Sequence, residues 1–306
     1  MKAALIPTLD PFDFREAFFE SSEQAKALLP PSTYFYISRI EHFKDFMKLP
    51  LLPHRKTVHD FMFLTRGHTA RSKGLDNHPF GPNTFFFLPA YQITTHDMMT
   101  HDTTGFYCHF DTEVLRKNFV LHDITASFSF LQLIGNPIVH LDETAIESGA
   151  LTDVIALLTR IETEHRSAYP DRYDLIQMHL LTLFVTLRRY ADTTDKGIAN
   201  SALRITQQYK NALSQHIYDK HLVTDYAAML AVSPNHLNKC VKAVTGKSAH
   251  DLLDEMILLE AKVFLKQSTL TISEIAYKIS KQDPSDFGRF FKQKTNLTPS
   301  EYRHMD

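Results

Sequence analysis

The sequence predicts an α+β protein with a β-rich first half and an all-helical final third. Three observations predict this arrangement. Short aromatic and β-branched runs bounded by turn residues recur between residues 58 and 110. Apolar residues at helical spacing dominate after about residue 112. In the final third, a helix–turn–helix pattern occurs twice, at an offset of 49 to 50 residues.

The composition is that of a soluble globular protein with enough apolar material for two cores. The chain has 306 residues, of which 43% are hydrophobic and 22% charged. No stretch reaches the roughly 18 consecutive apolar residues of a membrane span, and the first residues lack a signal-peptide pattern. Cys108 and Cys240 are expected to be small buried residues rather than a disulfide pair. We therefore expect a cytoplasmic protein with no membrane partner.

Charge is unevenly distributed along the chain. Residues 200–306 contain 14 Lys and Arg against 11 Asp and Glu, a net charge of +3, whereas the remainder contains 19 against 24, a net charge of −5. Basic residues therefore favour the final third only weakly. Charge alone does not identify a nucleic-acid partner.

Three segments of the first half are predicted strands, at residues 58–65, 83–89 and 105–110. Each is rich in aromatic or β-branched residues, and Gly or Pro lies at or near their ends. Strands of this kind and spacing predict a small antiparallel barrel or sandwich.

A predicted helix at residues 171–191 has apolar residues around most of its circumference. Such a helix needs burial on two sides. It either packs between its own domain and a second copy, which predicts a homodimer, or is the central helix of one domain. The polar segment that follows is the preferred linker. The predicted domains are residues 1–191 and 201–306, with the linker at 192–200.

The internal repeat has a physical reason at each of its matched positions. The first repeat is residues 223–230 and 233–242, and the second is residues 272–279 and 283–292. Ala227 and Ala276 are small where two helices would cross closely. Ser233 and Asp283 are predicted N-caps, each followed by proline at the first helical position. Apolar residues behind them are expected to face inward: Leu237, Val241, Phe287, Phe290 and Phe291.

The outward faces of the two second helices carry polar and basic residues. Lys and Arg suit phosphates and guanine, and Asn suits adenine edges, so both helices are candidate recognition helices. The predicted DNA-binding residues are Ser233, Asn235, His236, Asn238, Lys239, Lys242, Ser285, Arg289 and Lys292. A predicted helix of about 20 residues between the repeats spans about 30 Å, near the 34 Å repeat of DNA. The alternative is an all-α bundle that binds protein or peptide.

Residues 209–303 resemble the DNA-binding region of the AraC/XylS family of bacterial regulators. The stretches that carry the resemblance are 226–227, 233–237, 244–248, 259–262, 274–277, 283–285, 287, 289–292 and 298–303. The sequence departs from the family pattern where Ser280-Lys281 replaces Gly-Phe, where Asp286 replaces a tyrosine, and where Asn296 replaces a glycine. Ile257 likewise stands in place of a common arginine. These departures put tight base reading by the second repeat in doubt, and we expect the first repeat to supply most of the specificity.

The first half, from Tyr34 to Asp111, resembles the cupin-like sensor domain of many such regulators, through pieces at residues 53–55, 59–61 and 82–89. The resemblance implies a β-barrel that binds a small effector or mediates dimerisation. The barrel interior is the expected effector site. Its expected lining is Phe61, Phe63, Phe85, Phe87, Tyr107 and His109, although filling the core explains any single one of these aromatics more simply. Alternation pairs Phe61 with Phe63 and Phe85 with Phe87 on shared faces, but the sequence does not say which face is inner.

Signs of an enzyme are missing from the sequence. Metal-binding cupins usually carry a His-x-His pair, and this chain has none. It also lacks a P-loop, a Rossmann glycine pattern and a nucleophile elbow. His96 and His101 could hold a soft metal, but a polar loop between strands explains them more simply. We expect no catalytic residue, no metal site and no cofactor.

The sequence thus predicts a sequence-specific transcription regulator. Its expected partners are double-stranded DNA, an unidentified small-molecule effector, a second copy of itself, and RNA polymerase if the protein is an activator. The alternatives are a cupin-type metalloenzyme with an appended helical domain, and an interaction module that has lost DNA binding.

Overall fold

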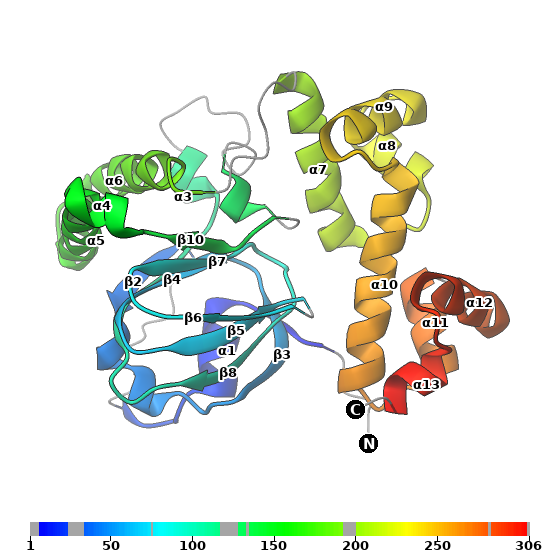
Figure 1. Ribbon diagram of the computed structural model, residues 1–306, viewed down its shortest axis with the longest axis horizontal. Coiled ribbons are helices and arrows are strands. Elements are labelled where there is room, and N and C mark those ends of the chain that lie inside the picture. The colour runs from blue at the N-terminus through cyan, green and yellow to red at the C-terminus, as the bar shows by residue number, and fades with distance from the viewer. Residues whose placement is uncertain are drawn as a thin grey trace. The chain divides into compact units, whose positions relative to one another are not determined.

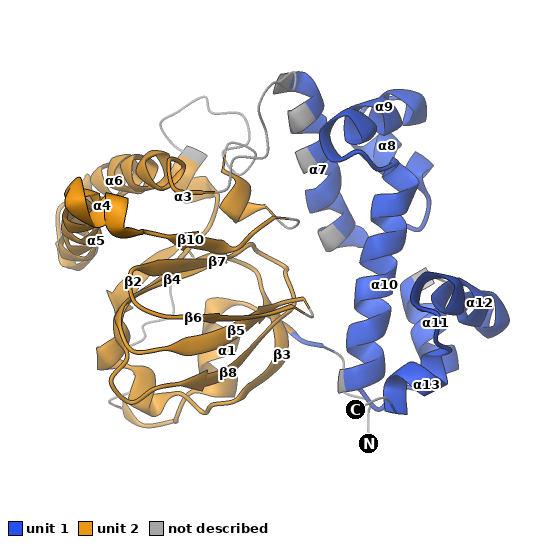
Figure 2. Cartoon of the chain, in the orientation of Figure 1, with its two compact units in different colours: residues 1–7, 195–306 blue, residues 8–194 orange. Residues whose placement is uncertain are grey.

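The computed structural model describes residues 6–23, 34–74, 76–116, 128–132, 135–191, 200–280 and 283–304. The chain divides into two compact units (Figure 2). The N-terminal unit is Thr8–Thr194, and the C-terminal unit contains Asp195–Asp306. The N-terminal unit combines sheets and helices, and the C-terminal unit is helical (Figure 1). Residues 192–199 of the predicted linker lie outside the described residues.

The N-terminal unit contains two five-stranded sheets, with orders β1-β3-β8-β5-β6 and β10-β7-β4-β9-β2. Neighbouring strands are antiparallel except for β1 and β3. The strands are β1 (Thr8–Leu9), β2 (Phe35–Arg39), β3 (Leu51–Lys56), β4 (His59–Arg66), β5 (Thr69–Lys73), β6 (Asp76–Phe80), β7 (Thr84–Leu88), β8 (Thr94–Met99), β9 (Thr104–Phe110) and β10 (Ile138–His140). The three strands expected from the sequence appear as β4, β7 and β9.

Helices accompany the strands and make up the C-terminal unit. Those of the N-terminal unit are α1 (Pro11–Phe18), α3 (Glu113–Arg116), α4 (Glu143–Glu147), α5 (Ala150–Arg166) and α6 (Arg172–Leu187), with 3-10 turns η1 (Ile40–His42), η2 (Lys44–Phe46) and η4 (Ser129–Leu131). Those of the C-terminal unit are α7 (Asn200–His216), α8 (Val223–Met229), α9 (Pro234–Thr245), α10 (Ala249–Gln267), α11 (Ile272–Ser280), α12 (Pro284–Thr295) and α13 (Pro299–His304). None of the described helices combines the length and hydropathy needed to cross a membrane.

Successive side chains of a strand point to opposite faces of a sheet. In the second sheet, both faces are covered and buried. On one side, Phe61 and Phe87 pack with Phe184 of α6, in a core that also includes residues of α5. Figure 1 shows α5 and α6 beside this sheet. On the other side, Phe86 stacks on Phe80 of β6 with 5.3 Å between ring centroids. The near-continuous apolar run of β7 follows from this two-sided burial.

The two helix–turn–helix repeats of the C-terminal unit lie along one long helix. α8 and α9 lie near one part of α10, and α11, α12 and α13 near its other end (Figure 1). α9 is capped at its C-terminus by Gly246 and α12 by Asn296, both in the left-handed conformation, with φ of 73° and 63°. Asn is one of the few non-glycine residues that adopt this conformation readily. The replacement of the family glycine by Asn296 therefore leaves the helix end intact.

Candidate nucleic-acid interface and interior pocket

The first repeat holds α9 with its polar side outward. Ser233 Oγ accepts a hydrogen bond of 3.2 Å from the backbone N–H of His236, which caps the helix. Ala227 is buried, as are Leu237 and Val241 on the inner side of α9. Because the inner side is fixed by packing, the opposite side of α9 is presented to solvent as a rigid surface.

That exposed side of α9 carries four of the predicted contact residues: Asn235, His236, Lys239 and Lys242. Among the described residues, no acid forms an ion pair with Lys239 or Lys242. Both ammonium groups are therefore open to phosphates or base edges. Asn238 is also exposed, but its Oδ1 accepts a 3.0 Å hydrogen bond from the backbone N–H of Ala249. This bond ties α9 to the start of α10, so Asn238, predicted from the sequence as a DNA contact, has a structural role.

The second repeat has the same frame with a different surface. Asp283 Oδ1 accepts a 2.8 Å hydrogen bond from the N–H of Ser285, and Phe287 and Phe291 are buried. Phe290 is only half-buried, so it faces the core less fully than its spacing predicted. The exposed residues of α12 include Ser285, Asp286, Arg289 and Lys292.

Asp286, unexplained by the sequence, forms an ion pair with Arg289 one turn along the same helix. The two side chains are 54% and 80% exposed, so the pair is a surface pair of small net strength. It nevertheless neutralises the guanidinium that would face DNA. The two candidate recognition helices are therefore unequal: the lysines of α9 form no ion pair within the described part of the chain, whereas the arginine of α12 is paired.

Contacts with α10 set the spacing of the repeats. Its 19 residues span about 28 Å at 1.5 Å per residue. At its first turn, Tyr209 of α7 donates a 2.8 Å hydrogen bond to the carbonyl of Ala249. Lys294 of α12 forms a 2.8 Å ion pair with Asp254 of α10. Near its last turn, Arg303 of α13 donates to the carbonyl of Leu265. The rod length is close to the 34 Å between successive major-groove segments on one face of DNA.

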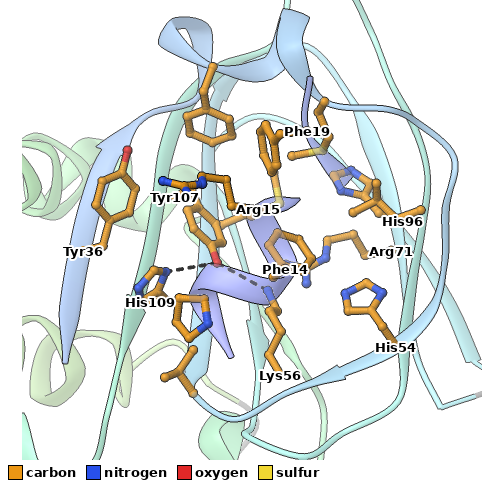
Figure 3. A pocket seen from close by; sticks show the side chains of 16 residues that line it. Phe14, Arg15, Phe19, Tyr36, His54, Lys56, Arg71, His96, Tyr107 and His109 are labelled. Atoms are coloured by element: carbon orange, nitrogen blue, oxygen red, sulfur yellow. Dashed lines mark hydrogen bonds between the residues drawn. The ribbon is translucent and has the colours of Figure 1, made fainter. Parts of the chain in front are cut away.

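A pocket with a cavity volume of about 50 Å³, partly open to solvent, lies between the two sheets of the N-terminal unit (Figure 3). Its lining residues come from both sheets and from the neighbouring segments: Pro11, Phe14, Arg15, Phe19, Tyr36, Phe43, Met47, Leu51, His54, Lys56, Val58, Met62, Arg71, His96, Tyr107 and His109. Most of the lining is apolar or aromatic, as in many small-molecule sites.

A buried charge cluster lies at this pocket. Asp60, which is fully buried, accepts a 2.8 Å hydrogen bond from Arg71 Nη1 and also pairs with Lys56. Burial alone would raise the pKa of Asp60, but Arg71 and Lys56 outweigh it and lower the pKa. Burial lowers the pKa of Lys56 to about 8, with Asp60 opposing that shift. Lys56 Nζ also donates a 3.3 Å hydrogen bond to the hydroxyl of Tyr107 (Figure 3).

Two buried histidines of the pocket stay neutral. Burial, reinforced by Lys56, lowers the pKa of His54 to about 3. Burial likewise holds the pKa of His96 well below its usual range, and its Nε2 lies 2.7 Å from Thr69 Oγ1. His96 is therefore engaged within the sheet, which accounts for one of the two histidines that could have held a soft metal. Among the described residues, no group of three or more His, Cys, Asp or Glu side chains could hold a metal ion.

The six residues expected to line an effector site do not form one surface. Tyr107 and His109 line the pocket. Phe61, Phe63, Phe85 and Phe87 lie in the core on the helix-facing side of the second sheet instead. Lys56, Arg71 and His54 also line the pocket, although the sequence did not predict them there. The alternation of β9, where Tyr107 and His109 interrupt Phe106, Cys108 and Phe110, is the one signal that separates the two faces.

Two capped helix–turn–helix repeats joined by one long helix are the arrangement of a double helix–turn–helix DNA-binding domain. Residues 226–305 match a family model described as "Helix-turn-helix domain". The HTH-type transcriptional activator RhaR of Enterobacter sp. (strain 638) is 21% identical over 159 residues, which are 52% of this chain and 56% of that protein. RhaR of Salmonella schwarzengrund is 24% identical over 149 residues, 49% of this chain and 53% of that protein. The chain thus spans about half the length of these curated relatives.

Solved structures are similar at low overall scores. The C-terminal domain of AraT, a response regulator from Geobacillus stearothermophilus, is 25% identical with a TM-score of 0.31. The aligned region is 33% of this chain and 91% of the AraT chain. ToxT from Vibrio cholerae is 13% identical with a TM-score of 0.38, and the aligned region is 88% of this chain and 98% of the ToxT chain. The family model shows that residues 226–305 form a helix-turn-helix domain, as the resemblance to the AraC/XylS family implied.

Proposed function

We propose that this protein is a sequence-specific DNA-binding transcription regulator that responds to a small molecule bound in its N-terminal unit. The observation that carries the proposal is the pair of capped helices, α9 and α12, whose exposed sides bear Lys239, Lys242, Arg289 and Lys292. The activator role in the names of the relatives supports activation as the direction of control, with RNA polymerase as the partner. Such a regulator works in the cytoplasm, where bacterial DNA lies.

The effector half of the proposal rests on the pocket between the two sheets. A cupin-like barrel is the architecture that best fits two facing sheets around an apolar pocket with a few polar groups. A ligand there shifts the protein between arrangements only if it binds one of them more tightly than the other.

The test of DNA binding is a titration of the full chain with the DNA upstream of its own coding region, beside random DNA of equal length, at several salt concentrations. We expect preference for the upstream fragment and a linear fall of log affinity with log salt concentration. Equal affinity for both fragments would leave nonspecific binding only. No binding with an intact fold would favour the interaction module.

Homodimerisation through α6 is the second part of the proposal. Met178 and Val185 are 50% and 42% exposed, and Thr182 lies between them on the same side of the helix. Two exposed apolar side chains on one side of a helix suit contact with a second copy of the chain in an isologous interface. Sedimentation of the Met178→Glu/Val185→Glu variant should show a monomer at concentrations where the unmodified chain is a dimer. The control is Leu52→Glu, which changes an apolar residue that is 70% exposed on β3.

A further inference from the structure

Two buried cations of the pocket between the sheets share one carboxylate. The Lys56 and Arg71 side chains are each 3% exposed and share a single carboxylate, that of the fully buried Asp60. Asp60 does not itself line the pocket, whereas both cations do. A buried charge without a counter-charge is costly. The two cations therefore face the pocket with room for one more anion.

Polar atoms at the same place have no partner among the residues that the structure describes. Arg71 Nη1 bonds to Asp60, but the buried Arg71 Nε lacks an acceptor there. His54 Nδ1 lies 2.7 Å from the carbonyl of Leu52, which assigns the ring proton to Nδ1. His54 Nε2, buried and without a partner within the described part of the chain, is then a free acceptor. Within the described residues, Arg71 Nε therefore lacks a hydrogen-bond acceptor and His54 Nε2 lacks a hydrogen-bond donor.

The walls around these groups are apolar. The ammonium of Lys56 lies 4.8 Å from the ring centroid of Phe14 and 5.3 Å from that of Tyr107. Phe14 and Phe18 of α1 pack on the His54 ring at 5.2 and 4.8 Å. Figure 3 shows Lys56, His54 and Arg71 close together, with Phe14 beside them. The hydroxyl groups of sugars and other polyols make poor contacts with such an apolar lining, whereas an aromatic or aliphatic group packs against it.

We propose that the pocket binds a small monocarboxylate with an apolar body, whose carboxylate accepts hydrogen bonds from Lys56 and Arg71 and whose hydroxyl group, where present, donates to His54. This inference rests on the proposed function, because it names the chemical class of the effector. The carboxylate completes the charge balance of the cluster, and charge-assisted hydrogen bonds give the head group its affinity.

The experiment is calorimetric titration of the full chain with benzoate, its three monohydroxylated forms, hexanoate and octanoate, each beside its neutral amide. We expect a carboxylate of this panel to bind at least about tenfold more tightly than its amide, a difference of about 1.4 kcal/mol. Among the benzoates, one hydroxylated form should bind more tightly than benzoate itself. Equal affinity for acid and amide would overturn the proposal, and so would the absence of binding by every carboxylate.

A variant separates the charge of Lys56 from its bulk. Lys56→Met keeps most of the side-chain volume and leaves Arg71 paired with Asp60. It should weaken carboxylate binding about tenfold and change amide binding by less than about twofold. The matched control is Lys48→Met, since Lys48 is an exposed lysine of the same unit outside the pocket. Unchanged carboxylate affinity in folded Lys56→Met would overturn the assignment. Should this variant not fold, the comparison of acid with amide on the unmodified chain still decides.

DNA binding is measured separately on the ligand-free chain. Carboxylate binding lost with DNA preference intact overturns this inference alone. The reverse result overturns the proposed function and leaves the pocket's ligand class standing.

Discussion

Replacing Asp286 with alanine should strengthen DNA binding by this protein. In α12 the Asp286 carboxylate pairs with the guanidinium of Arg289, the one arginine among the predicted contact residues of that helix. Arg289 must leave this pair to reach a phosphate or a guanine. The carboxylate itself also repels phosphates that approach the same side of the helix. Asp286→Ala removes both costs.

The size of the effect follows from the exposure of the pair. An exposed ion pair of this kind is worth about 0.2–1 kcal/mol, which Arg289 no longer gives up. A carboxylate at about 7 Å from a phosphate repels it by about 0.6 kcal/mol in water. The sum of about 0.8–1.6 kcal/mol corresponds to an affinity gain of about four- to fifteenfold. Salt screens both contributions, so the gain shrinks as ionic strength rises.

The assay is fluorescence-anisotropy titration of the upstream DNA at two or more salt concentrations. Release of one further counterion by a freed Arg289 should steepen the salt dependence by about 0.9. Asp219→Ala is the matched control, because it removes the same charge from an exposed position of the C-terminal unit outside α9 and α12. Unchanged or weaker binding by Asp286→Ala, or an equal gain in Asp219→Ala, would refute the view that this side of α12 faces DNA.

Three further predictions concern α9, the core and the pocket. Lys239→Ala should weaken binding to all DNA sequences similarly and lower the salt slope by about 0.9, as anisotropy titration would measure; an unaltered slope would mean that this lysine does not contact phosphate. Phe184→Ala removes a fully buried ring and should lower the free energy of unfolding of the N-terminal unit by about 3–5 kcal/mol. Urea denaturation measures this loss beside Thr182→Ala, an exposed change that should cost far less. Carboxylate binding should be strongest below pH 8 and weaken as pH rises through about 8, where the ligand-free chain loses the proton of Lys56. Calorimetry at pH 7 and pH 9 tests this, and equal affinities would contradict it.

The direction of that pH dependence depends on the groups that face Lys56. The folded protein holds the pKa of Lys56 below the ordinary value for lysine, so the ligand-free ammonium is complete only below about pH 8. Asp60 keeps its charge throughout this range, because Arg71 and Lys56 outweigh the effect of burial and lower its pKa. His54 and His96 are neutral because burial lowers both pKa values. Burial also holds the pKa of Tyr107 well above 10. Among these groups, Lys56 is the one that changes charge between pH 7 and pH 9.

Local signals predicted the C-terminal region well. Ser233 and Asp283 cap their helices as the Ser-Pro and Asp-Pro pairs indicated. Caps, turns and 3.6-residue periodicity depend on residues a few positions apart, so they can be read along the chain. The partner of Asp286 is also only three residues away, a spacing that places acid and base on one side of a helix.

The N-terminal pocket was predicted poorly for the opposite reason. Strand alternation showed that Phe61 and Phe63 share a face, but the face that meets the helices is chosen by α6, which lies more than 100 residues further along the chain. Likewise, Lys56, Asp60 and Arg71 come together from three strands. Nothing in their individual segments marks them as a buried cluster. The pairing of distant strands and helices decides which face of a strand packs against the helices and which faces the pocket.

The sequence by itself determined the repeated helix–turn–helix units, their caps and their exposed basic residues, because each depends on local conformational preference and periodic burial. Only the tertiary structure decided that the aromatic strands fill a helix-facing core, and that the pocket lies on the other side of the sheet. It also decided that two cations share one buried carboxylate there. Those features arise from the pairing of distant strands, where the side of the sheet, the burial and the net charge are set by neighbours that the local sequence does not contain.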